Sequence, residues 1–365
     1  MKTTFFALAT CLVAVGLHAE TNEAGTWNSK GAAAYLDQRS SWWITWQPAA
    51  RDHDTFCISC HTALPYALGR PALRAALGEQ GPSANERQLL ENVKKRVRLW
   101  SEVLPFYDDE KRGVPKTAES RGTESILNAL ILTSYDQRAG KLSDDARLAL
   151  DNMWALQLKS GDQKGAWTWL NFHNEPWEAD DSQFWGATLG ALAAGNAPKD
   201  YRSNPTIQEN LKLLGEYFQR AMAQESLINR TFLLWASTKL PDLLTAKQQE
   251  SIVEELLSKQ QEDGGWSTTS IVISTWKRRD GTALETRSDG FGTGLVSFVL
   301  ERTGMPRSDS RLKKGLAWLA QNQDKSEGQW RATSMNKERD PASDAGRFMS
   351  DAATAYAVLA LTDSK

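Results

Sequence analysis

The sequence predicts an all-α fold in which outer and inner helices alternate along the chain as six pairs. A pattern of glutamine, glycine and tryptophan recurs in four partial copies along the 365 residues, which is the signature of a repeat architecture. Each copy is followed by an apolar segment rich in small residues, typical of a helix that is buried on most faces. Four of these segments open with a short polar residue and an acid, and the acids lie 57, 108 and 62 residues apart. The middle interval therefore spans two repeats.

The most complete copy of the pattern begins at Lys314 and ends at Trp330, with the form K-G-x-x-W-L-x3-Q-x4-G-x-W. This run agrees with the QW motif of triterpene cyclases, and the chain resembles the squalene/hopene cyclase and protein prenyltransferase families. The resemblance implies an (α/α)6 toroid, two concentric rings of helices around a central cavity. The partial copies cover Gln261 to Trp266, Gln157 to Trp167 and Lys30 to Leu36.

The elements follow in register from the amino end. Lys30 to Trp43 is the first outer helix, and Asp54 to Leu68 is the first inner helix, which Pro65 and Pro71 shorten or kink. Residues 20–84 thus form the first pair, and residues 85–365 form the remaining pairs of the same toroid. The other inner helices begin near Thr123, Asp180, Asn229, Ser288 and Ser350, four of them with cap signatures. The long insert at 270–287 is a candidate lid over the mouth of the ring.

Residues 1–19 read as a cleaved secretory signal. Lys2 supplies the positive end, an apolar run follows, and Ala19 is the small residue that signal peptidase prefers. We therefore expect a periplasmic or secreted protein. The mature chain has 42 basic and 45 acidic residues, which gives no indication of a nucleic-acid partner. No other segment is long and apolar enough to predict a transmembrane helix.

Both cysteines of the mature chain lie in one C-x-x-C-H sequence, formed by Cys57, Cys60 and His61. Two thiols at this spacing, followed directly by an imidazole, predict one covalently attached heme c with His61 as the proximal iron ligand. A Cys57–Cys60 disulfide is the first alternative. A structural zinc site is the second, although it would need a further Cys/His pair, for which His53 and His173 are the candidates.

The sequence does not single out one residue as the distal iron ligand. Met349 and His173 each precede an inner helix on the same rim as the haem motif, and both are candidates. His53 ranks below them because it lies only four residues before Cys57. A core role for Met349, and a loop imidazole bonded to backbone for His173, are the structural alternatives.

The cyclase resemblance suggests a second site. Class II cyclases carry D-x-D-D, whose middle aspartic acid protonates the substrate, and the matching run here is Glu178-Ala179-Asp180-Asp181. Asp180 would be the acid, next to Asp181. Because similar polar–acid pairs open three other inner helices, an N-cap explains this run without any chemistry. The zinc ligands of the prenyltransferase branch have no counterpart in the corresponding helices.

Three functions follow from these patterns. The first is haem-iron redox chemistry, either electron transfer to a redox partner protein or oxidation of a small hydrophobic ligand held in the cavity. The second is a class II terpene cyclase-like isomerase or lyase that uses Asp180. The third is a lipid- or glycan-binding module in which a Cys57–Cys60 disulfide is structural.

Overall fold

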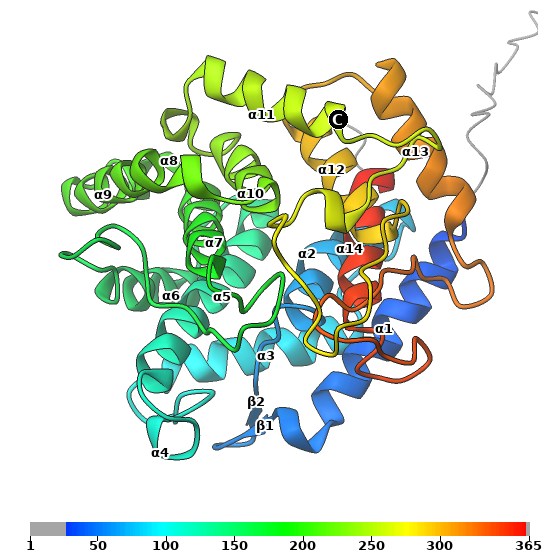
Figure 1. Ribbon diagram of the computed structural model, residues 1–365. Coiled ribbons are helices and arrows are strands. Elements are labelled where there is room, and N and C mark those ends of the chain that lie inside the picture. The colour runs from blue at the N-terminus through cyan, green and yellow to red at the C-terminus, as the bar shows by residue number, and fades with distance from the viewer. Residues whose placement is uncertain (1–26, 363–365) are drawn as a thin grey trace, which may run out of the picture.

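Six outer and six inner helices form a double ring in the computed structural model, which describes residues 27–362 (Figure 1). The inner helices contact one another in chain order, and the last packs on the first, which closes the ring. The predicted all-α toroid is therefore confirmed. The outer helices are α1 (Ser29–Thr45), α3 (Ala84–Arg98), α6 (Asp144–Ala155), α9 (Pro205–Ala221), α11 (Ala246–Ser258) and α13 (Ser310–Asn322). The inner helices are α2 (Ala63–Ala76), α5 (Lys116–Ala139), α7 (Ser182–Asn196), α10 (Leu227–Ser237), α12 (Gly290–Arg302) and α14 (Phe348–Thr362).

Short helices and strands lie in the connections between the helices of this ring. Helices α4 (Asp109–Arg112) and α8 (Lys199–Arg202) lie in connections, and strands β1 (Ala50–Arg51) and β2 (Thr55–Phe56) pair antiparallel ahead of α2. Within residues 27–362 no helix has the length and apolar character needed to cross a membrane. The predicted signal sequence, residues 1–19, lies outside the described residues.

Aromatic side chains fill the axis of the inner ring. The Phe232 ring lies 5.7 Å from Trp185 and 5.9 Å from Tyr356, which in turn lies 5.6 Å from Phe291, measured between ring centroids. These rings pack at steep angles, the arrangement that aromatic quadrupoles favour. One pocket lies at the amino ends of the inner helices and another at their carboxyl ends. The cavity expected along the axis is thus packed at the aromatic layer, and the space for ligands is at the mouths.

The repeated motif closes the outer helices, as its pattern predicts. The Gln323 side chain donates to the carbonyl oxygen of Gly328 (2.9 Å), and the Trp330 indole donates to a carbonyl in the last turn of α13 (2.7 Å). The indole bond satisfies a carbonyl of the last helical turn, which has no partner inside the helix, and the glutamine bond fixes the loop that follows. After α11 the equivalent glutamine is Gln260 rather than the predicted Gln261, because Gln260 makes the bond to the motif glycine.

The predicted helix starts are correct only in part. Asp289 caps α12, where its carboxylate accepts from two backbone N–H groups. Glu124 and Asp351 instead lie inside α5 and α14, because both helices begin earlier than predicted. Their carboxylates bind arginines of the outer ring, Arg96 in α3 and Arg39 in α1. Acids that look like local caps in the sequence therefore join the two rings.

The first inner helix begins later than predicted, at Ala63. The hydroxyl of Ser59 accepts hydrogen bonds from the backbone N–H groups of Thr62 and Ala63, which fixes the start of the helix. The C-x-x-C-H sequence therefore lies in the loop between β2 and α2 rather than in the first turn of the helix. This loop still faces the mouth of the ring, where the prediction placed it.

Candidate functional site

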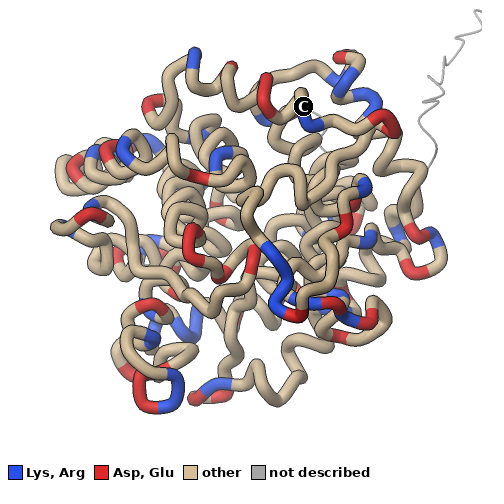
Figure 2. Tube along the Cα trace, viewed as in Figure 1, with Lys and Arg blue, Asp and Glu red and all other residues tan. Residues whose placement is uncertain are grey.

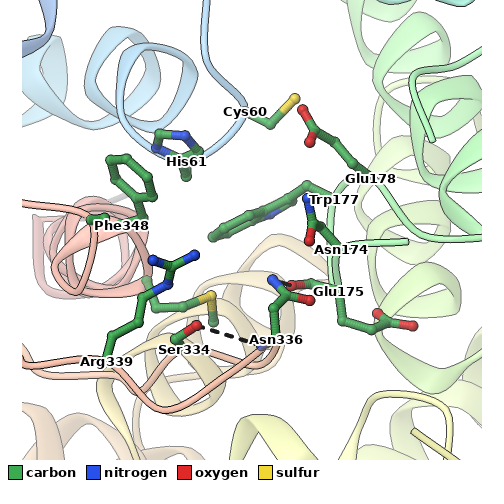
Figure 3. Close-up of a pocket in the computed structure, with 12 residues that line it drawn as sticks. Cys60, His61, Asn174, Glu175, Trp177, Glu178, Ser334, Asn336, Arg339 and Phe348 are labelled. Atoms are coloured by element: carbon green, nitrogen blue, oxygen red, sulfur yellow. Dashed lines mark hydrogen bonds between the residues drawn. The ribbon is translucent and has the colours of Figure 1, made fainter. Parts of the chain in front are cut away.

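A pocket at the amino ends of the inner helices is lined by Cys60 and His61 of the predicted haem motif, whereas Cys57 is buried and does not line it (Figure 3). Three segments that are distant in sequence form it: the loop before α2, the loop at 174–178, and the segment from 334 into the start of α14. Its volume is about 160 Å³, and it opens to solvent. Cys60, His61 and Met349 all line it.

Both cysteines are buried thiols, with 6 % of Cys57 and 5 % of Cys60 exposed, and they form no disulfide. Burial raises the pKa of Cys57 to about 12 and also raises that of Cys60. Such thiols are poor nucleophiles, because the thiolate is the reactive form. Cys60 lines the pocket, and Figure 3 shows its sulfur beside the carboxyl group of Glu178.

The imidazole of His61 is held by a chain of hydrogen bonds. Its Nδ1 lies 2.8 Å from the Thr62 hydroxyl, and that hydroxyl donates to Asp351 at 2.6 Å. The Asp351 carboxylate also accepts two bonds from the Arg39 guanidinium and one from Tyr35. Burial raises the pKa of Asp351 while Arg39 opposes this, and donors converging on both oxygens are the arrangement of an ionised group.

This chain fixes the tautomer of His61. Because the Thr62 proton is given to Asp351, the Thr62 oxygen must accept from His61, and the imidazole proton is therefore on Nδ1. Burial lowers the pKa of His61 to about 3, so the ring is neutral. Among residues 27–362, His61 Nε2 has no hydrogen-bond partner. Its lone pair is available for an iron or another electrophile.

Aromatic rings hold the imidazole in place. Phe348 stacks on it with centroids 3.8 Å apart, and Trp43 meets it edge-on at 5.1 Å. Trp177 lies 6.1 Å away and forms the opposite wall of the pocket (Figure 3). The ring thus keeps one orientation, since its face, one edge and Nδ1 are all engaged.

Two carboxyl groups with raised pKa values also line the pocket. Burial raises the pKa of Glu178 to about 7, against the opposing effects of Asn174 and Lys116. Burial, followed by the nearby charges of Asp181 and Asp180, raises that of Glu175 to about 8. Near neutral pH, Glu175 therefore carries a proton and Glu178 exchanges one.

The remaining predicted residues divide between this pocket and the surface. Met349 is 3 % exposed and shares the pocket with His61. His173 lies outside it, exposed and 2.8 Å from Asp180. The structure therefore brings Met349, and not His173, to the haem motif. His53, the weaker candidate, is also partly exposed, beside Asp52.

Asp180 does not have the environment that the cyclase hypothesis requires. Its side chain is 78 % exposed, and hydrogen bonds from Asn171 and then His173 lower its pKa. Asp181 is half-buried and bonded to Ser226 and Asn229, with a pKa that burial raises. A proton donor needs a carboxyl group that stays protonated, and Asp180 is ionised.

Comparisons with known proteins support the fold. No family model matches the chain, and no curated protein matches it. A solved glycosidase structure has a similar fold, with 12 % sequence identity and a TM-score of 0.51. The match covers 92 % of this chain and 97 % of the glycosidase. At this identity the likeness shows the shared toroid alone.

Sequence patterns did not reveal Thr62, which bonds to His61, or several residues that line the pocket, among them Glu175, Phe348 and Arg339. Two acids flanking a proline and a tryptophan at 175–178 are a local signal, but only folding places them against the haem motif. No cluster of three or more His, Cys, Asp or Glu side chains that could hold a metal ion is found in the described part of the chain.

Proposed function

We propose that this protein is a c-type haem protein in which Cys57 and Cys60 attach the porphyrin and His61 is the proximal ligand. It would act in electron transfer or in haem-dependent oxidation of a ligand at the mouth of the ring. The observation that carries the proposal is His61, whose Nδ1 is bound and whose Nε2 is free, together with the free thiols of Cys57 and Cys60, of which Cys60 lines the same pocket.

The donor set fits this group. Thioether bonds need two free thiols at the C-x-x-C spacing, and the axial bond needs an unprotonated ring nitrogen. Met349 supplies a thioether sulfur in the same pocket. The pocket volume of about 160 Å³ is below the roughly 300–1,000 Å³ of cofactor-sized sites, so most of a porphyrin would extend past the pocket walls.

The chain's own residues would tune such a site. The haem would supply one-electron redox chemistry at its iron. Thr62, Asp351 and Arg39 hold the Nδ1 proton and fix the imidazole plane. A hydrogen bond at Nδ1 makes the Nε2 lone pair more basic, and therefore a stronger metal ligand. Phe348 and Trp43 keep water from one side of the ring.

The test is expression of the full chain in a bacterium that matures c-type cytochromes. We expect a red protein, a pyridine haemochrome spectrum after denaturation, and a mass increase of one haem that survives unfolding. Cys57→Ser with Cys60→Ser should lose the covalent haem. Met349→Leu should change the visible spectrum, whereas Met153→Leu, a buried control elsewhere in the core, should not. A colourless protein whose two sulfurs are joined would refute the proposal.

Glu178 favours a second candidate function, acid–base catalysis. A carboxyl group with a pKa of about 7 in an open pocket is suited to accept and return a proton near neutral pH. Glycoside hydrolysis uses a pair of carboxyl groups, which Glu175 and Glu178 would provide, and a glycosidase shares this fold. Glu178→Gln should then reduce hydrolysis of aryl glycosides by about 100-fold or more, while Glu216→Gln, on outer helix α9, has no effect. The absence of hydrolysis by the wild-type protein would remove this candidate.

A further inference from the structure

A second, larger cleft adjoins the His61 pocket. It lies between the segment 271–289, here called the strap, and the segment from the end of α13 to the start of α14. Its volume is about 510 Å³, well within the range of small-ligand sites. Ser334 and Arg339 line both spaces, so the cleft and the pocket share part of one wall.

The strap includes nearly all of the insert at 270–287, the candidate lid, and it forms a fixed wall. The Arg278 guanidinium donates to the carbonyl oxygen of Ser334 (2.9 Å), and the Trp276 indole donates to that of Met335 (2.7 Å). Arg278 is 8 % exposed and bonds a second carbonyl within the strap. A wall held by buried side-chain bonds to backbone is formed before a ligand arrives, which reduces the entropy cost of binding.

The lining is rich in charged groups of both signs, in equal number, and Figure 2 shows positions of both signs along the strap and the loops beside it. Such a surface offers many donors and acceptors without a net field that would select a polyanion or a polycation. Arg339 stands at the inner end, where Figure 3 shows its guanidinium between Phe348 and Ser334. Within the described residues this guanidinium has no hydrogen-bond or ion-pair partner, so its planar fork is available to a ligand. The charged lining residues are Arg278, Arg287, Arg331, Arg339, Asp263, Glu285, Asp289 and Glu338.

One tryptophan of the repeated motif contributes to this cleft. Trp266 and Trp330 are buried, as expected for residues of the architecture, whereas Trp318 is partly exposed and lines the cleft. Its indole nitrogen donates to Asp263 (3.0 Å), which fixes the orientation of the ring. A fixed aromatic ring among paired donors and acceptors matches a sugar, which has an apolar C–H face and a rim of hydroxyl groups.

We propose that this cleft binds a neutral oligosaccharide, with a sugar ring on Trp318 and the end of the chain at Arg339, beside the His61 pocket. The inference goes beyond the haem proposal and depends on neither Cys57 nor His61. A lipid is disfavoured because the lining is polar, and a polyanion because its charges balance.

Titration of the purified protein with cellohexaose, maltohexaose and chitohexaose, followed by calorimetry and tryptophan fluorescence, tests the proposal. We expect at least one to bind, with affinity at least tenfold weaker in Trp318→Ala. Trp100→Ala is the matched control, since Trp100 is also partly buried but stacks on Arg121 outside the cleft. Hexagalacturonate should bind more weakly than the neutral ligand. Binding by none of the three, preference for the polyanion, or unchanged binding in Trp318→Ala would each overturn the proposal.

A variant without haem separates the two proposals. Cys57→Ser with Cys60→Ser should bind the oligosaccharide with the wild-type affinity, within about twofold. If the wild-type protein lacks haem but binds the sugar, only the haem proposal fails. If it carries haem and ignores every sugar, only the cleft proposal fails.

Discussion

Removing the charge of Asp351 should destabilise the whole ring, because this residue joins the last inner helix to the first outer helix. The Arg39 guanidinium lies 2.7 and 3.1 Å from the two oxygens of Asp351. The two side chains are only 4 % and 1 % exposed. Asp351→Asn keeps the shape of the side chain but leaves the Arg39 charge buried with one remaining partner, the more exposed Asp344.

Loss of one member of a buried ion pair costs about 3–5 kcal/mol, since the other charge stays desolvated. At about 2 °C per kcal/mol for a chain of this length, Tm should fall by roughly 6–10 °C. The free energy of unfolding is measured by urea denaturation of the wild-type protein and the variant, and Tm by calorimetry. Arg39→Met and the double variant complete a double-mutant cycle. The double variant should lose less free energy of unfolding than the sum of the losses in the two single variants.

The control is a pair on the outside of the ring. Arg98 and Asp145 are also bidentate, with both distances at 2.7 Å, but Arg98 is 59 % exposed. Arg98→Met should therefore cost only about 0–1 kcal/mol. If the free energy of unfolding of Asp351→Asn is within 1 kcal/mol of the wild-type value, the pair does not hold the ring closed and the reasoning fails.

Three further predictions concern single positions. Glu175 has a pKa of about 8 in the folded protein and near 4.3 in the unfolded chain. Between these pH values its carboxyl group is protonated in the folded protein and ionised in the unfolded chain. Stability should therefore fall by up to about 1.4 kcal/mol per pH unit between roughly pH 4.5 and 8. Glu175→Gln should flatten that slope in urea titrations, and an unchanged slope would contradict the assignment. Gly328→Ala should cost about 1–3 kcal/mol more than Gly140→Ala in thermal unfolding. Both positions have positive φ, but only at Gly328 would the new Cβ meet a backbone oxygen, at 2.1 Å. Thr62→Val should move the imidazole proton of His61 toward Nε2, seen in ring ¹⁵N shifts, and identical shifts would exclude the hydrogen-bond chain.

The order of the helix pairs was accessible from the sequence because its signals are local. The glutamine and tryptophan of each motif bond within the same turn that they close, as Gln323 and Trp330 show. The same locality explains the errors. Glu124 and Asp351 have the pattern of caps, but their partners Arg96 and Arg39 come from other helices, and no local pattern shows that contact.

The sequence by itself determined the repeats, the helix pairs and the two thiols followed by an imidazole, since each depends on residues a few positions apart. Only the tertiary structure decided which side chains share the mouth of the ring. It placed Met349 in the same pocket as His61 and left His173 on the surface. The bond from Thr62 to Asp351 spans 289 positions, and it fixes the tautomer of His61. Such contacts arise when the ring closes and buries their polar groups together, because a buried polar group needs a partner wherever in the chain that partner lies.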